Sequence, residues 1–291
     1  MLHKFNSLVC IIIMMTAFNL TAQHRMAYKI FDAEGKEITY EKMLKQLLKN
    51  DVVFFGELHN NPIAHWLELT VTQDIFEQKK EQLQLGAEMF EADNQLIINE
   101  FFQNNISEKS FEDECRLWNN YKTDYKPLLN FAKENQLAFI ATNVPRRYAS
   151  MVHKQGIESL NGLTDEAKSY IAPLPIEIDL TVNCYKNMAD MMGAHGEGNS
   201  DIVKAQAVKD ATMAHFIATN YQKGNVLLHF NGSYHSDYHE GIIWYLKKLK
   251  PRLDIITITS VEQNSVDTLS DEYKNKADFI ICIPENMTKT Y

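Results

Sequence analysis

Six short and mostly apolar runs constrain the fold of this chain more than any other feature of its sequence. Helix-like segments or loops separate these runs, which occupy residues 52–55, 83–89, 137–141, 226–230, 253–259 and 279–283. A strand that is covered on both faces has a nearly continuous apolar sequence, because neither of its faces meets water. Strands that alternate with helices form mainly parallel sheets. We therefore expect an α/β fold with a mainly parallel sheet that is flanked by helices.

The segment between the third and the fourth run has a different pattern. It shows no strong strand signal, it is interrupted by Pro173 and Pro175, and two of its stretches have helical spacing. Helical spacing without strands predicts a helical unit rather than a further part of the sheet. We expect a smaller helical domain at about 150–222, inserted into one α/β core that is formed by residues 27–149 and 223–291.

The first residues predict a secretory signal peptide. Lys4 precedes an apolar stretch from Leu8 to Leu20 that is too short to span a bilayer comfortably, and the small residue Ala22 follows. We expect cleavage after Ala22, so that residues 1–22 are removed and residues 23–291 form an exported protein of the periplasm or the cell envelope. Cys10 lies near the start of the apolar stretch instead of ending it, which argues against a lipoprotein.

The charge and the cysteines exclude two kinds of site. The chain has a net charge of −9, and nucleic-acid binding depends on basic clusters, so we expect no nucleic-acid partner. Cys115, Cys184 and Cys282 are far apart and form no C-x-x-C pair, so a cysteine zinc site is not expected either. Whether two of these cysteines form a disulfide stays open.

Two segments of the form G-x-x-H end two of the apolar runs. Gly56 to His59 follows the first run, and Gly232 to His235 follows the fourth. Loops at the carboxyl ends of parallel strands form the ligand crevice of an open α/β sheet. The two loops can therefore bring two imidazoles to one ligand, with Glu57 beside them. The alternative for the first motif is an ordinary turn, in which Glu57 caps the next helix and His59 lies on the surface.

Three further groups can join this crevice. Glu88 directly ends the second apolar run, and Arg146 and Arg147 follow the third, where they can bind a carboxylate or phosphate or neutralise nearby glutamates. Tyr234 precedes His235, and tyrosine is one of the known protein ligands of haem iron.

Three other polar residues near these motifs have a simpler interpretation. We expect His65 to be a packing histidine of a helix, His229 to be a buried core histidine with satisfied nitrogens, and Glu91 to be a solvated loop acid.

The order of five segments resembles the ChaN-like haem-binding family, which belongs to a superfamily with the Tiki metalloproteases, the TraB proteins and the erythromycin-esterase-like enzymes. The resemblance covers roughly residues 28–285, and the segments are GELH, the strand-ending Glu88, NVPRR, QAVKDATMA and GSYH. It implies a Rossmann-like α/β domain with a smaller helical domain, haem as the cofactor, and a role in haem or iron uptake in the bacterial envelope. Under this hypothesis the haem-binding candidates are His59, His235, Arg146, Arg147 and Tyr234.

The wider superfamily implies an alternative, a divalent-metal-dependent hydrolase of the Tiki type. Its metal ligands would be Glu57, His59, Glu88 and His235, and one of the two glutamates would act as the catalytic base for a metal-bound water. A third hypothesis is a crevice that has lost its function. The sequence does not choose between haem, a divalent metal and a vestigial site, and it leaves open the enzyme activity, a peripheral association with the envelope and a homodimer.

Overall fold

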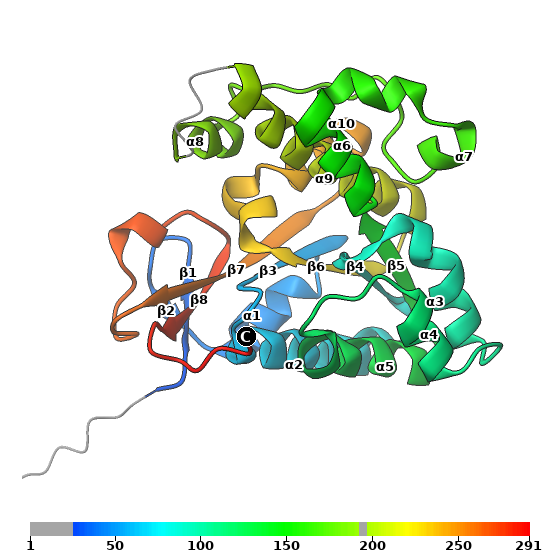
Figure 1. Cartoon of the computed structure of the whole chain (residues 1–291). Coiled ribbons are helices and arrows are strands. Elements are labelled where there is room, and N and C mark those ends of the chain that lie inside the picture. The colour runs from blue at the N-terminus through cyan, green and yellow to red at the C-terminus, as the bar shows by residue number, and fades with distance from the viewer. Residues whose placement is uncertain (1–25, 192–196) are drawn as a thin grey trace, which may run out of the picture.

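A single eight-stranded sheet forms the centre of the protein (Figure 1). The computed structural model describes residues 26–191 and 197–291, so the predicted signal peptide lies outside the described residues. The strand order is β2-β1-β8-β7-β3-β6-β4-β5. The strands span β1 Lys29–Asp32, β2 Glu37–Ile38, β3 Val52–Glu57, β4 Leu83–Glu91, β5 Ala138–Asn143, β6 Val226–Gly232, β7 Ile255–Gln263 and β8 Phe279–Pro284.

The sheet is mainly parallel, as the apolar runs predict. The six runs correspond to β3 to β8, and all pairs among these strands are parallel. The hairpin of β1 and β2 adds an antiparallel edge, because β1 pairs antiparallel with both β2 and β8. The predicted α/β class is therefore confirmed.

Helices cover both faces of the sheet. Figure 1 shows α1 to α5 on one side and α6 to α10 on the other. The chain crosses the sheet in one direction from β3 to β5 and returns through β6 to β7, and right-handed crossovers then place the connecting helices on opposite faces. The helices span α1 Tyr40–Leu47, α2 Pro62–Lys79, α3 Gln95–Phe102, α4 Glu108–Glu114, α5 Lys126–Glu134, α6 Arg146–Gln155, α7 Asp165–Lys168, α8 Asn183–Met191, α9 Glu197–Asn220 and α10 Ile242–Leu249.

The helical segment at 150–222 contributes to the layer above the sheet. Its longest helix, α9, packs against β5, α6 and α10. Residue 150 lies within α6, which begins at Arg146 directly after the end of β5. This segment therefore covers one face of the sheet and can supply side chains to the carboxyl edge of the strands.

Strand β3 shows why the predicted strands are continuously apolar. Val53 and Phe55 belong to the apolar core on the side of α1, α2 and α5, whereas Val52 and Phe54 belong to the core on the side of α9 and α10. Successive side chains of a strand point to opposite faces. Both faces of β3 are buried, so the four positions from Val52 to Phe55 require apolar side chains.

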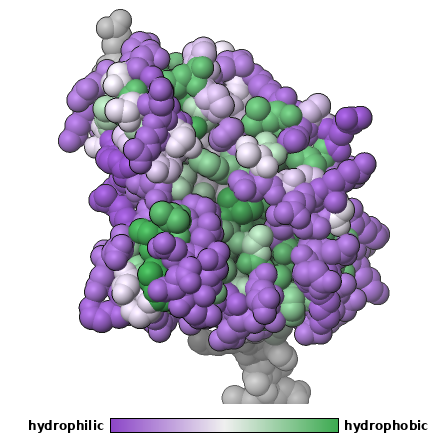
Figure 2. Space-filling model, turned by 90° about the vertical axis from the view of Figure 1, so that its right-hand side faces the viewer, coloured by the Kyte–Doolittle hydropathy of each residue, from purple (hydrophilic) through white to green (hydrophobic). Residues whose placement is uncertain are grey.

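On the side of α3, α4 and α7, apolar residues gather in a central band between two polar regions (Figure 2).

Among the described residues, no helix has the length and apolar character that a bilayer crossing requires. Cys115, Cys184 and Cys282 are all buried, and all three are free thiols.

Candidate functional site

The two G-x-x-H motifs lie side by side at the carboxyl edge of the sheet. Strands β3 and β6 are parallel neighbours, and their register pairs Gly56 with Asn231 and Glu57 with Gly232. β4, which carries Glu88, pairs with the other side of β6. The strand order therefore places three of the predicted site segments next to one another, although they lie far apart in the sequence.

The glycines of the two motifs make room for each other. A Cβ on Gly56 would lie 2.9 Å from Cα of Ser233, and a Cβ on Gly232 would lie 2.7 Å from Nε2 of His59. Real Cβ atoms essentially never approach other atoms so closely. Each glycine is thus required by a residue of the other motif.

A cavity of about 520 Å³ opens at these loops. Six of the seven predicted site residues line it: Glu57, His59, Glu88, Arg146, Tyr234 and His235. The remaining one, Arg147, is not part of this lining; its guanidinium is 2.5 Å from Asp93 Oδ2 and lies over the ring of Tyr148. The cavity size is within the usual range for small-ligand sites, roughly 300–1,000 Å³. We call this cavity the crevice.

His59 is held by a carboxylate. Its Nδ1 lies 2.5 Å from Oε1 of Glu57, which also accepts a hydrogen bond of 2.8 Å from the hydroxyl of Tyr125. The ring contacts Trp118 edge to face, with 4.8 Å between the centroids. Because Nδ1 faces the carboxylate, Nε2 is the ring nitrogen at the Gly232 side. A carboxylate behind one ring nitrogen is the usual arrangement for a histidine that ligates a metal through the other.

Histidine and carboxylate shift each other's pKa at this position. Although burial raises the pKa of Glu57, its hydrogen bonds with His59 and His65 hold that pKa below the usual range. Burial lowers the pKa of His59, but the hydrogen bond with Glu57 and the charge of Glu88 raise it overall. Glu57 is therefore ionised at neutral pH despite its burial.

His235 lies between two carboxylates. Its Nδ1 is 2.5 Å from Oδ1 of Asp210, and its Nε2 is 3.1 Å from Oε1 of Glu88. Burial lowers the pKa of His235, but these two charges raise it to about 10. The other oxygen of Glu88 accepts a hydrogen bond of 2.8 Å from the backbone N–H of Gly232. His235 is thus a buried imidazolium that ties the second motif to β4 and α9.

Helix α9 supplies three site residues that the sequence analysis did not select, namely Gln206, Lys209 and Asp210. Gln206 and Lys209 line the crevice, and Asp210 binds His235. In the sequence this segment stands out only as the QAVKDATMA part of the family resemblance. Asp210 is 1% exposed between the buried Ala207 and Met213, so an acidic residue on an apolar helix stripe was the available signal.

The simpler interpretations of His65, His229 and Glu91 have different outcomes. His229 is fully buried and lies 2.8 Å from the hydroxyl of Thr142 and 3.0 Å from Oδ1 of Asn231, so the prediction of a satisfied core histidine is confirmed. Glu91 is not a solvated loop acid, because it is buried at the end of β4 and lines the crevice. His65 packs in α2 as expected, but it also contacts carboxylates.

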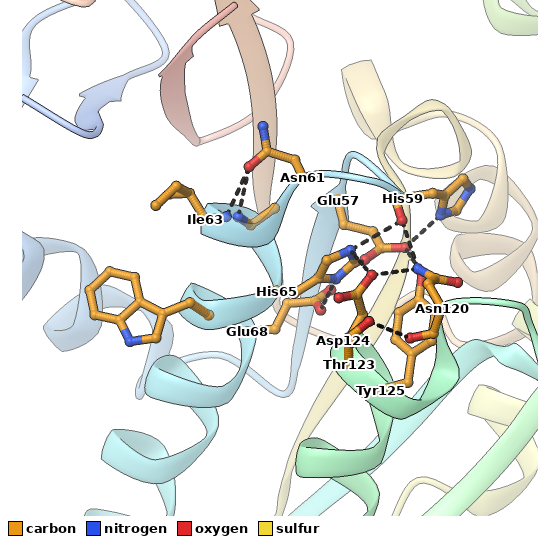
Figure 3. A network of polar contacts seen from close by, with 12 residues as sticks. Glu57, His59, Asn61, Ile63, His65, Glu68, Asn120, Thr123, Asp124 and Tyr125 are labelled. Carbon is orange, nitrogen blue, oxygen red and sulfur yellow. Dashed lines mark hydrogen bonds and ion pairs between the residues drawn. The ribbon is translucent and has the colours of Figure 1, made fainter. Parts of the chain in front are cut away.

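The cap of α2 excludes the turn alternative for Glu57. The side chain of Asn61 accepts hydrogen bonds from the backbone N–H groups of Ile63 and Ala64, which caps the helix. Glu57 is instead directed into a buried network with His65 and Glu68 (Figure 3). Among the described residues, Glu57, His65 and Glu68 are also the group whose ligand atoms lie close enough to hold a metal ion, all within 4.8 Å of one another.

The fold and the crevice define an α/β protein of Rossmann-like architecture with its candidate ligand site at the carboxyl edge of a parallel sheet. The chain belongs to the ChaN family, described as haem-binding uptake proteins of the Tiki superfamily, and the match to this family covers residues 43–246. The resemblance seen in the sequence is thus confirmed.

The alignment with one solved ChaN structure agrees with this fold. A structure of cofacial haem binding to ChaN of Campylobacter jejuni aligns with a TM-score of 0.66 and 19% identity over 87% of this chain and 96% of that one. The erythromycin esterase EreC in its open conformation aligns with a TM-score of 0.48 and 11% identity, over 89% of this chain and 98% of that one. The chloroplastic protein RETICULATA-RELATED 5 of Arabidopsis thaliana is 24% identical over 222 residues, which are 71% of this chain but only 30% of that relative.

Proposed function

We propose that this chain is an exported haem-binding protein that contributes to haem or iron uptake in the bacterial envelope, and that haem binds in the crevice. Membership of a haem-binding family supports the ligand. The observation that carries the proposal is His59, whose Nδ1 is held by the carboxylate of Glu57 while the ring lines the crevice. This arrangement orients a histidine toward iron and increases its basicity.

Other residues of the crevice fit the rest of a haem molecule. Arg146 and Lys209 line the crevice and can bind the propionate groups, because both carry fixed positive charge. Trp118 and Met188 supply apolar contact area for the porphyrin.

Tyr234 is a weaker candidate for the iron ligand than His59. Its hydroxyl donates a hydrogen bond of 3.0 Å to the carbonyl oxygen of Cys184, and burial raises its pKa. Ligation by Tyr234 would require the loss of both that hydrogen bond and the phenolic proton. The hydrogen bond of the His59 ring is at Nδ1, so Nε2 can bind iron without the loss of that contact, and we assign the iron ligand to His59.

A haemin titration tests the proposal. The purified protein should give a saturable change of the Soret band, and His59→Gln should weaken binding while a buried-core control, Ile75→Val, leaves it unchanged. The absence of any saturable change in the wild-type protein would refute haem binding.

Terminal sequencing of the exported protein tests cleavage after Ala22, and sedimentation with and without haemin tests for a homodimer.

A divalent-metal-dependent hydrolase is the second candidate. The observation in its favour is the pair of Glu88 Oε1 and His235 Nε2, 3.1 Å apart, with Asp210 as the carboxylate on the other ring nitrogen. A metal at this pair would have to displace the proton that His235 carries. Metal content that falls in both His59→Ala and His235→Ala would favour this candidate over haem binding.

A further inference from the structure

A second cluster of ligand-type side chains lies behind the wall of the crevice, on the other side of the Glu57 carboxylate (Figure 3). His65 Nδ1 is 2.8 Å from Glu57 Oε2 and 3.2 Å from Glu68 Oε2. All three side chains are buried, with exposures of 6% or less. Glu57 comes from the end of β3, and the other two come from the first turns of α2.

We propose that Glu57, His65 and Glu68 bind one divalent transition-metal ion at a buried site that is separate from the haem crevice. One imidazole nitrogen and two carboxylate oxygens suit ions such as Zn²⁺, Mn²⁺ or Co²⁺. With metal–ligand distances of about 2.1 Å, two adjacent ligands of an octahedral ion lie about 3.0 Å apart. The two distances from His65 Nδ1 lie on either side of this value.

A buried carboxylate oxygen without a partner points to a bound cation. Among the described residues, Oε1 of Glu68 is buried and has no hydrogen-bond partner, while Oε2 of Glu57 faces the His65 ring at 2.8 Å. Buried polar atoms are almost always satisfied, so such orphans call for an explanation such as an ion. Glu68 offers this oxygen in addition to its Oε2, which contacts the same ring nitrogen of His65 as Oε2 of Glu57 does.

The charge balance of the cluster supports the same conclusion. Glu57, Glu68 and Asp124 are buried together, and within residues 26–191 and 197–291 their ion pairs are all to histidines. The ligand atoms of Glu57, His65 and Glu68 all lie within 4.8 Å of one another, so two carboxylates share one buried region. A divalent cation would compensate both carboxylates at once.

The remaining contacts of His65 orient its ring for metal binding. Nε2 lies 3.2 Å from the carbonyl oxygen of His59 and 3.3 Å from Oδ2 of Asp124. Nε2–H can therefore donate to these oxygens, and a metal that replaces the proton on Nδ1 would meet the lone pair of the nitrogen that faces the two glutamates. The same carbonyl oxygen accepts a hydrogen bond of 2.9 Å from Asn120, which keeps it in place.

Glu57 connects this site with the crevice. Its Oε1 contacts His59 and its Oε2 faces His65. A metal at Oε2 would hold the carboxylate in one orientation and so keep the His59 ring in place. The buried metal would have a positioning role and need not touch a ligand in the crevice.

Cobalt binding tests the proposal. The chain is produced with Co²⁺ in the medium, passed through a chelating resin, and analysed for cobalt content and for circular dichroism. Wild-type protein should keep cobalt in a stoichiometric amount, and Glu68→Gln should lower it by about tenfold or more, since it replaces a ligand oxygen. Glu77→Gln, an exposed glutamate on the same helix, is the matched control and should keep the cobalt.

Glu88→Gln separates this site from a metal in the crevice. It should keep its cobalt, because Glu88 belongs to the crevice and not to the cluster. Loss of cobalt in folded Glu88→Gln, or retention in folded Glu68→Gln, would overturn the proposal, and so would a wild-type protein without cobalt.

X-ray absorption of the cobalt-loaded wild-type protein gives a result that needs no variant. The cluster contains one histidine, whereas a crevice site with His59 and His235 would contain two. One imidazole per cobalt is expected, and two would overturn the proposal. Haemin binding is measured separately on the same samples, so that failure of the metal site and failure of the haem proposal can be told apart.

Discussion

The sharpest test of the site is the replacement of Gly232 by alanine. The added Cβ would lie 2.7 Å from Nε2 and 2.8 Å from Cε1 of His59. An ordinary contact between such atoms is about 3.5 Å, so the ring must retreat by about 0.8 Å. It cannot do so freely, because Nδ1 is held at 2.5 Å by Glu57 and the ring packs against Trp118.

The expected cost follows from these contacts. Overpacking of a well-filled site costs about 1–3 kcal/mol, and a lost hydrogen bond to a charged group costs about 1.5–3 kcal/mol. The two are alternative ways to relieve one clash, so we expect Gly232→Ala to lower the free energy of unfolding by about 1–3 kcal/mol. Haemin affinity should fall as well, because the displaced residue is the proposed iron ligand.

Urea unfolding and haemin titration of Gly232→Ala measure both effects. Gly162→Ala is the matched control, because a Cβ at Gly162 would have no atom within 4 Å. Gly232→Ala could instead unfold at the same urea concentration as Gly162→Ala and bind haemin with the same affinity. That result would refute the close contact between Gly232 and the His59 ring.

Three further predictions concern the same edge of the sheet. Gly56→Ala should lower the free energy of unfolding by about 3 kcal/mol, the upper end of the range for overpacking, because the added Cβ would lie 2.9 Å from the backbone atom Cα of Ser233. A urea midpoint equal to that of the wild type would contradict this. Although burial lowers it, two carboxylates raise the pKa of His235 from 6.5 to about 10, so its contribution to stability is full below pH 6.5 and is lost as the pH rises through 10. The stability difference between wild type and His235→Gln, measured by urea unfolding, should therefore shrink from neutral pH to pH 10, and a constant difference would count against a charged His235. Arg146→Gln should weaken haemin binding several-fold while Arg147→Gln does not, since only the first side chain lines the crevice; equal losses in both titrations would argue against propionate binding by Arg146.

The ends of the strands show where sequence patterns stop being informative. β3 continues from the apolar run through Gly56 to Glu57, and β6 continues to Gly232. Polar residues and glycine are poor strand signals, so the pattern predicts that the strands end earlier. They stay in the sheet because Glu57 is buried and its carboxylate is held by His59 and Tyr125.

The partners of the site histidines could not be predicted in the same way. Asp210 binds His235 from α9, and Glu57 reaches His65 only because α2 begins close to the end of β3. Such contacts depend on how a helix packs on the sheet and on which of its faces is turned to the crevice. A one-dimensional pattern indicates that α9 has a polar residue on an apolar stripe, but not what that residue meets.

The sequence by itself determined the class of fold, the positions of the six core strands and six of the residues that line the crevice, because burial on both faces leaves a local apolar signature and these site residues closely follow it. Only the tertiary structure decided that β6 inserts between β3 and β4, which brings the two G-x-x-H motifs into contact. The physical reason is that parallel strands pair through long crossovers, so that strand order depends on non-local packing and leaves no trace in the spacing of residues along the chain.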